Sequence, residues 1–118
     1  MPNLKEIEER IIRFREERDW CQFHNPRSLA TSISIEAAEL LEVFQWCKDD
    51  EVTRIAAERL PHIREELGDI LIYLIMMAHD LNIDLIEAAA EKVSLNEVRY
   101  PIDRAKGKAT KYTDLENQ

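Results

Sequence analysis

The sequence predicts an all-α fold, with four to five helices forming a bundle that a neighbouring subunit completes. Three observations carry this prediction. The 118 residues include only two glycines and four prolines, too few for a turn-rich sandwich or barrel. Apolar residues recur at helical spacing along most of the chain, and no segment alternates as a half-buried strand would.

The length predicts a single domain over residues 1–118, because a chain of this size has room for only one hydrophobic core. We expect residues 1–98 to be helical and residues 99–118 to form a basic tail. Apolar residues make up 45% of the chain and charged residues 34%, a balance that suits a packed core under a well-solvated surface.

The first helix is predicted over residues 3–19, with Asn3 as its N-cap. The segment WCQFHNP, residues 20–26, breaks the helical period, and its Asn-Pro pair favours a turn. A second helix is expected over residues 28–46, and a polar connector follows at residues 48–50.

Helical character resumes near Glu51, and Pro61 either kinks that helix or opens a new one. After Asp69, the segment up to His79 is apolar nearly all round, which is typical of a helix buried on most sides. In so small a chain, we expect another subunit to supply the missing cover.

The last helix is predicted to begin at Asn82 or Asp84 and to run to about Val98. Tyr100 and Pro101 end it, and the basic tail follows.

The net charge of −8 and the pI near 4.9 disfavour a nucleic-acid-coating protein, which needs a basic footprint. Residues 92–112 nevertheless hold six basic and two acidic side chains, so this segment carries +4 and the remainder −12. An acidic body with a basic tail suits a protein that binds a cation in one place and a polyanion in another, although a solvated surface also explains it.

We expect no membrane span and a cytoplasmic protein. The longest apolar run, residues 70–78, is about half of the roughly 18 residues that a span requires, and no apolar signal region follows Met1. Cys21 and Cys47 form no metal-binding or redox motif, which favours two reduced cysteines.

Two acidic pairs fall on helix faces that should be buried. Glu36 and Glu39 lie three residues apart on the second predicted helix, and Glu66 and Asp69 repeat this spacing at the head of the apolar helix. Buried carboxylates are costly unless a cation offsets them. Four oxygen ligands without Cys or His suit Mg²⁺, or Mn²⁺ as a substitute. Alternatively, these acids pair with arginines nearby in sequence, which are Arg54, Arg59 and Arg64.

The motif Glu-x-x-Glu followed by Glu-x-x-Asp resembles the MazG-like superfamily of all-α nucleoside triphosphate pyrophosphatases. The blocks ERDWCQFHNPRSL (17–29), EAAELLEVFQW (36–46), EELGDILIYL (65–74) and NEVRYP with KYTDL (96–115) resemble the branch that contains the dCTP pyrophosphatases. The resemblance covers nearly the whole chain in the family's order.

The resemblance implies a set of site residues. Glu36, Glu39, Glu66 and Asp69 match the magnesium ligands. The implied substrate-binding positions fall in three groups: Tyr73 beside the substrate; Lys92, Asn96 and Arg99 on the phosphates; and Lys111 and Tyr112 in a tail that closes over the nucleotide. Trp20, Phe23, His24 and Trp46 fall in blocks that resemble the base and sugar pocket, although large aromatic residues are more often core. Such proteins are homotetramers, dimers of dimers with shared sites.

The implied reaction is attack by water on the α-phosphorus of a dNTP, giving a nucleoside monophosphate and pyrophosphate. Bound metal stabilises the charge that develops on the phosphoryl oxygens. Glu36 and Glu39 are the candidates to accept the proton from water, and sequence does not separate them. Lys92, Arg99 and Lys111 would hold the polyphosphate. The expected role is housecleaning of the nucleotide pool, with a leaning to dCTP and modified dNTPs.

Three other classes of protein fit the sequence less well. A non-catalytic helical interaction or regulatory module explains the apolar helix but not the inward-facing carboxylates. A di-iron bundle uses Glu-x-x-His pairs, which are lacking here. The dipeptide His79-Asp80 resembles that of HD phosphohydrolases, but the further metal ligands of that class are missing.

Overall fold

The computed structural model describes residues 1–115, which are helical throughout their regular parts and contain no strand. The predicted all-α class is therefore confirmed. The contacts divide the chain into two units, residues 1–82 and the residues from Ile83 onward. The single domain predicted for residues 1–118 stays a prediction, and the last three residues of the predicted tail, 116–118, lie outside the described part.

The first unit begins with α1 (Leu4–Glu17), whose N-terminus is capped as predicted. The Asn3 side chain accepts a hydrogen bond from the Glu6 backbone N–H at 2.9 Å. Asp19 then takes a left-handed conformation with φ of 54°, and Trp20–Phe23 form one turn of 3-10 helix.

The second helix, α2 (Pro26–Glu42), is shifted toward the N-terminus relative to the prediction. Asn25 and Ser28 form a capping box, with each side chain bonded to the other's backbone at 2.9 Å, and Pro26 occupies the first turn. The Asn-Pro pair is thus a helix start rather than a free turn. At the other end the helix stops at Glu42, and residues 43–46 form turns.

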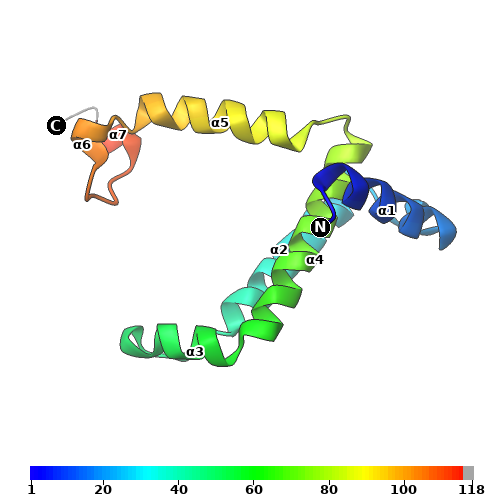
Figure 1. Ribbon diagram of the computed structural model, residues 1–118, viewed down its shortest axis with the longest axis horizontal. Helices are drawn as coiled ribbons and strands as arrows, with labels where there is room; N and C mark the ends of the chain where they lie inside the picture. The colour runs from blue at the N-terminus through cyan, green and yellow to red at the C-terminus, as the bar shows by residue number, and fades with distance from the viewer. Residues whose placement is uncertain (116–118) are drawn as a thin grey trace. The chain divides into compact units, whose positions relative to one another are not determined.

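Pro61 opens a new helix and does not kink an old one. A short α3 (Val52–Glu58) is separated from α4 (Leu60–Asp80) by Arg59, and Pro61 lies in the first turn of α4, where its missing N–H leaves no bond unmade. α2 and α4 lie side by side, and α1 crosses the later part of α4 (Figure 1).

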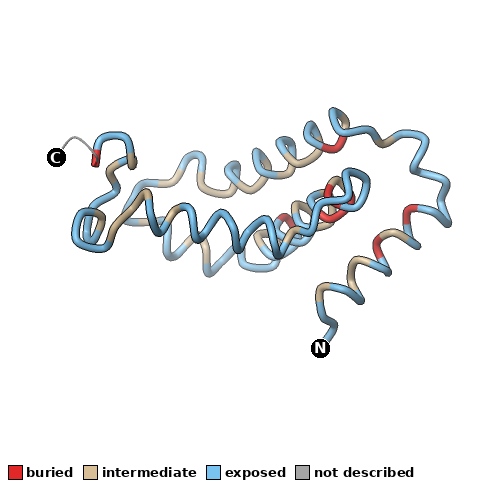
Figure 2. Tube along the Cα trace, turned by 90° about the horizontal axis from the view of Figure 1, so that it is seen from above, coloured by how far each residue is buried: buried red, intermediate tan, exposed pale blue. Residues whose placement is uncertain are grey.

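The core of the first unit is small. Its buried apolar side chains come from α1, α2 and α4 and are Ile11, Leu29, Ile75, Met76 and Ala78. Much of the chain is exposed along its length (Figure 2). Among residues 1–115, no helix combines the length and the apolar character needed to cross a membrane.

The second unit consists of α5 (Leu85–Arg99), α6 (Ile102–Ala105) and α7 (Tyr112–Leu115). Asp84 caps α5 by accepting a hydrogen bond from the Glu87 N–H at 2.9 Å, which decides between the two predicted starts. The segment predicted as a tail contains two helical turns, and Leu115 in the second is only 1% exposed.

Candidate metal and nucleotide site

Three glutamates from two helices converge between α2 and α4. One carboxylate oxygen each from Glu36, Glu39 and Glu66 lies within 4.8 Å of the others. Glu36 and Glu39 extend from α2, and Glu66 extends from α4, which packs alongside. The three-residue spacing on α2 thus does what helix geometry predicts, because it places both side chains on the face that meets α4.

The acid cluster, defined as these three glutamates, is partly buried, and no lysine or arginine among residues 1–115 pairs with it. Glu66 is 5% exposed, and Glu36 and Glu39 are half-buried. One oxygen of Glu36 and one of Glu66 are buried without a hydrogen-bond partner. Such groups cost stability unless something binds them.

The electrostatics at Glu36 agree with this crowding. Its pKa is raised, first because the protonated form shares a hydrogen bond with Glu66 and then because burial disfavours the charge. The negative charges of Glu66 and Asp69 raise the pKa further, while a hydrogen bond with Glu39 opposes the shift. Asp69 therefore lies close enough to act on Glu36, although it stands outside the tight group of three.

The nearby arginines do not compensate these acids. Arg54 pairs instead with Glu51 and Glu58, at 3.0 and 3.1 Å. None of the ion pairs among residues 1–115 joins Arg59 or Arg64 to the predicted motif. The alternative in which these arginines neutralise the four acids is not what the structure contains.

The donor set fits a hard divalent cation. It is built from carboxylate oxygens alone, two of them are buried and unpartnered, and the local charge is strongly negative. A bound cation would give a partner to the buried oxygen of Glu36 and to that of Glu66, neither of which has a hydrogen-bond partner in the described chain.

His62 is a neighbour of the acid cluster that the sequence reasoning missed. Its Nε2 lies 3.7 Å from an Oε1 of Glu66, and its side chain is 39% exposed. The signal was present, because His62 precedes Glu66 by four residues and so shares its helix face.

Within residues 1–115, the residues predicted to line the base pocket make no polar or ring contact with the acid cluster. Trp20 packs edge-on against Phe14 at 5.5 Å, and its exposed fraction is 42%. Phe23 and Trp46 are 66% and 88% exposed. No hydrogen bond, ion pair or ring contact among residues 1–115 joins these aromatic side chains to the three glutamates. Tyr73 is half-buried on α4, one turn beyond Asp69.

His24 lies beside an ion pair between α1 and α4. Arg15 is 4% exposed and donates two hydrogen bonds to Asp80, at 2.8 and 2.6 Å. The His24 Nδ1 is buried without a partner, and its pKa is lowered, mainly by burial and then by the Arg15 charge. Asp80 is therefore committed to Arg15, which agrees with the rejection of an HD-type metal site.

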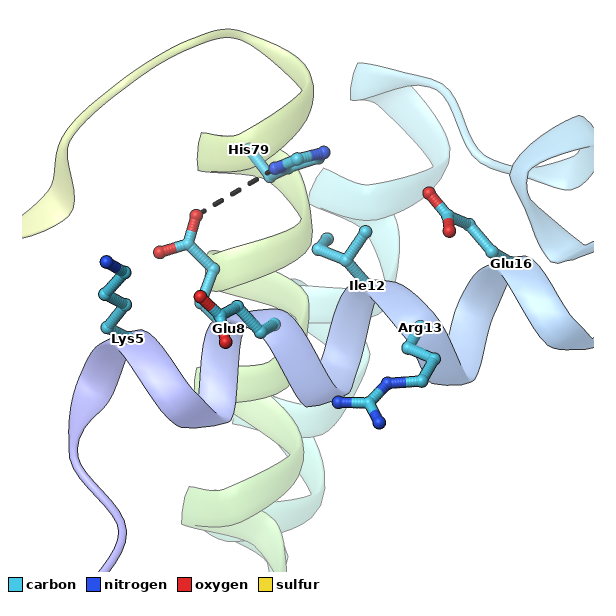
Figure 3. A pocket seen from close by; sticks show the side chains of 7 residues that line it. Lys5, Glu8, Ile12, Arg13, Glu16 and His79 are labelled. Carbon is cyan, nitrogen blue, oxygen red and sulfur yellow. Dashed lines mark ion pairs between the residues drawn. The ribbon is translucent and has the colours of Figure 1, made fainter.

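A second groove runs along α1, outside the acid cluster (Figure 3). Its volume is about 350 Å³, and His79 faces Glu8 there at 3.9 Å. The lining residues are Lys5, Glu8, Glu9, Ile12, Arg13, Glu16 and His79. Both signs of charge alternate along it, so it presents no convergent set of ligands for one kind of ion.

The predicted phosphate-binding residues belong to the second unit. Lys92, Asn96 and Arg99 follow one another at four- and three-residue steps on α5, and therefore share a face. The Arg99 guanidinium lies over the Tyr112 ring, 4.5 Å from its centroid. Lys111 precedes α7 directly and is exposed.

Comparison with known proteins places this chain. The profile of the MazG-like family matches residues 31–115, which include the four predicted metal ligands and the residues predicted to bind phosphate. The chain belongs to the MazG-like family. The predicted family is thus confirmed, and the relatives of this MazG-like chain extend the match to nearly its full length.

Two relatives carry the name dCTP pyrophosphatase 1. The protein from Bos taurus is 44% identical over 117 residues, covering 97% of this chain and 69% of its own length. The protein from Homo sapiens is 39% identical over 116 residues, covering 97% of this chain and 68% of its own length. A crystal structure of a pyrophosphatase from Archaeoglobus fulgidus is 40% identical with a TM-score of 0.82, over 86% of this chain and 94% of the other.

Proposed function

We propose that this chain is a hydrolase of acid anhydrides that converts deoxynucleoside triphosphates to monophosphates and pyrophosphate, with a leaning to dCTP and modified dNTPs. Its role is housecleaning of the nucleotide pool. The observation that carries the proposal is the acid cluster, an unbalanced set of carboxylates held between two helices of a MazG-like chain. The relatives named dCTP pyrophosphatase 1 support the leaning to dCTP.

Glu36, Glu39, Glu66 and Asp69 would hold Mg²⁺, or Mn²⁺ in its place. When bound, the ion stabilises negative charge on the phosphoryl oxygens and acidifies water. Glu36 or Glu39 accepts the proton that the attacking water releases, since both reach the cluster from the same face of α2.

The second unit supplies the cations for the polyphosphate. Lys92, Arg99 and Lys111 bind its oxygens, and Arg99 is the best suited of the three because a guanidinium can grip two oxygens at once. Asn96 contributes an amide on the same face of α5. The remaining substrate-binding positions are Trp20, His24, Trp46 and Tyr73, together with Tyr112, which contributes through its contact with Arg99.

We further propose a homotetramer, a dimer of dimers, working in the cytoplasm. The support is the apolar surface that the single chain leaves uncovered. Leu67 on α4 is 54% exposed, and Ile86, Val93 and Val98 on α5 are 63%, 55% and 76% exposed. Burial of such side chains against another copy recovers roughly 25 cal/mol per Å² of apolar surface.

The test is product identity. The protein is incubated with each dNTP and Mg²⁺, nucleotides are separated and pyrophosphate is assayed. We expect monophosphate plus pyrophosphate, fastest for dCTP, and no turnover after chelation. Glu66→Gln should abolish the reaction, while Glu65→Gln, at an exposed neighbouring carboxylate, should leave it intact.

Two results would overturn the proposal. Diphosphate plus orthophosphate would mean a different bond is cleaved. No turnover of any triphosphate with Mg²⁺ or Mn²⁺ would indicate the non-catalytic interaction module instead.

A further inference from the structure

The chain after α5 turns back on itself and brings Tyr112 to Arg99. Tyr100 ends α5, Pro101 prevents its continuation, and Gly107 with φ of 78° supports the reversal that leads to α7. Figure 1 shows α6 and α7 folded beside the end of α5. Leu115 in α7 is only 1% exposed.

The side chains of Tyr100, Tyr112 and Arg99 contact one another there, with Tyr112 between the other two. The Tyr100 ring meets the Tyr112 ring edge-on, with centroids 6.0 Å apart and planes at 80°. The Tyr112 ring also contacts Arg99, whose guanidinium carbon lies 4.5 Å from the ring centroid. Tyr100 thereby limits the rotation of Tyr112, and Tyr112 limits that of Arg99.

The kind of contact matters for what Arg99 can still do. A guanidinium stacked on a ring uses its face, while its N–H donors point outward in its plane. None of the ion pairs among residues 1–115 engages Arg99. The contact with the Tyr112 ring therefore restricts Arg99 while no ion pair occupies the N–H donors that bind a phosphate.

We propose that Tyr112 is a positioning residue for Arg99, which it holds in a fixed plane for a two-oxygen grip on the polyphosphate of the substrate. The role rests on the function proposed above and differs from a tail tyrosine that covers the nucleotide directly. Tyr112 acts through Arg99, so its ring matters and its hydroxyl does not.

The test is a double-mutant cycle read by binding of inorganic pyrophosphate in the presence of Mg²⁺, using calorimetry. Tyr112→Leu should weaken binding about 2- to 5-fold, the size expected of an exposed cation–π contact of about 0.5–1 kcal/mol. Tyr112→Phe keeps the ring and should stay within about 2-fold of the unmodified protein. In an Arg99→Ala background, Tyr112→Leu should have no further effect.

Steady-state kinetics give the second readout. For dCTP, we expect Tyr112→Leu to raise KM by a similar factor with kcat little changed, because Tyr112 reaches only the binding group. Mn²⁺ affinity and helical content by circular dichroism should not change. A loss of helical content would be checked with Leu115→Ala, which loosens α7 but keeps the tyrosine.

The outcomes separate this proposal from the one it rests on. Equal losses from Tyr112→Leu with and without Arg99, or a loss in Tyr112→Phe equal to that in Tyr112→Leu, would overturn the positioning role even where dCTP is hydrolysed. Absence of hydrolysis with an intact coupling between Tyr112 and Arg99 would overturn the proposed function alone.

Discussion

α4 carries two acidic side chains that meet neighbouring helices, and the chain treats them in opposite ways. Near its end, Asp80 receives two hydrogen bonds from the buried Arg15, which lowers the pKa of the Asp80 carboxyl. Near its start, Glu66 meets Glu36 and Glu39, and the pKa of Glu36 is raised.

The difference shows which of the two sites serves the fold. The Asp80 charge, paired with a buried arginine, links α1 to α4, whereas the like charges of the acid cluster, with only His62 nearby, weaken the packing of α2 on α4. A chain that can pair Asp80 so well has the means to neutralise Glu66 in the same way. That it leaves the acid cluster unbalanced is what a cation-binding role predicts.

The largest effect on activity should come from removing a negative charge near the acid cluster, at the start of α4. We expect Asp69→Asn to reduce dCTP hydrolysis at least about 100-fold, because a proposed metal ligand is lost. The metal-free protein should be as stable as the original or more so at neutral pH, since repulsion on Glu36 falls. Turnover assays, Mn²⁺ binding and thermal unfolding measure the loss of activity, the loss of the metal ligand and the stability, respectively. Undiminished turnover would show that Asp69 is not part of the site.

Removing the ion pair between Arg15 and Asp80 should mainly lower the stability of the fold. Arg15→Met leaves Asp80 without its cation, and we expect a loss of about 2–4 kcal/mol in the free energy of unfolding. The double variant Arg15→Met with Asp80→Leu should recover most of this loss, because it leaves no buried charge unpaired. Chemical denaturation followed by circular dichroism gives both values. A single variant as stable as the original would show that the pair is not structural.

The smallest effect concerns pH. The pKa of His24 is lowered in the folded chain, first by burial and then by Arg15, so protonation favours the unfolded state. This contribution is complete above pH about 6.5, the ordinary histidine value, and is lost as the pH falls through the folded pKa. His24→Gln should remove this part of the pH dependence between pH 7.5 and 5. Identical profiles for the two proteins would contradict it.

Asp80 contributes with the same sign but in a more acidic range. Its folded pKa lies below 3.8, so its stabilisation is present above that ordinary value and disappears as the pH falls through the lowered one. Measuring the free energy of unfolding of the Asp80→Asn variant below pH 4 separates the contribution of Asp80 from that of His24.

Local signals explain what the sequence could predict. Asn3 caps α1, and Pro61 opens α4, because caps and prolines act within one turn. The meeting of Glu36 with Glu66 followed from helix periodicity combined with the family's motif. The start of α2 was also a local signal, since Asn25 with Ser28 is a capping pattern that was interpreted as a turn.

Contacts between distant residues were out of reach. Arg15 and Asp80 are 65 residues apart, and nothing in either neighbourhood singles out the other. Arg99 and Tyr112 are closer in sequence, but their stacking depends on the reversal around Gly107 and on the burial of Leu115. Such pairings follow from the path of the chain, which residue spacing alone does not supply.

The two tryptophans give the protein a built-in optical probe. Trp46 is 88% exposed in the turn after α2, whereas Trp20 rests against Phe14 beside the Arg15 end of α1. In the isolated chain, Trp46 should emit at the longer wavelength typical of an indole in water. Replacing Trp46 with phenylalanine would leave Trp20 as the sole tryptophan. The intensity and quenching of the Trp20 fluorescence would then report on the 3-10 turn Trp20–Phe23 alone.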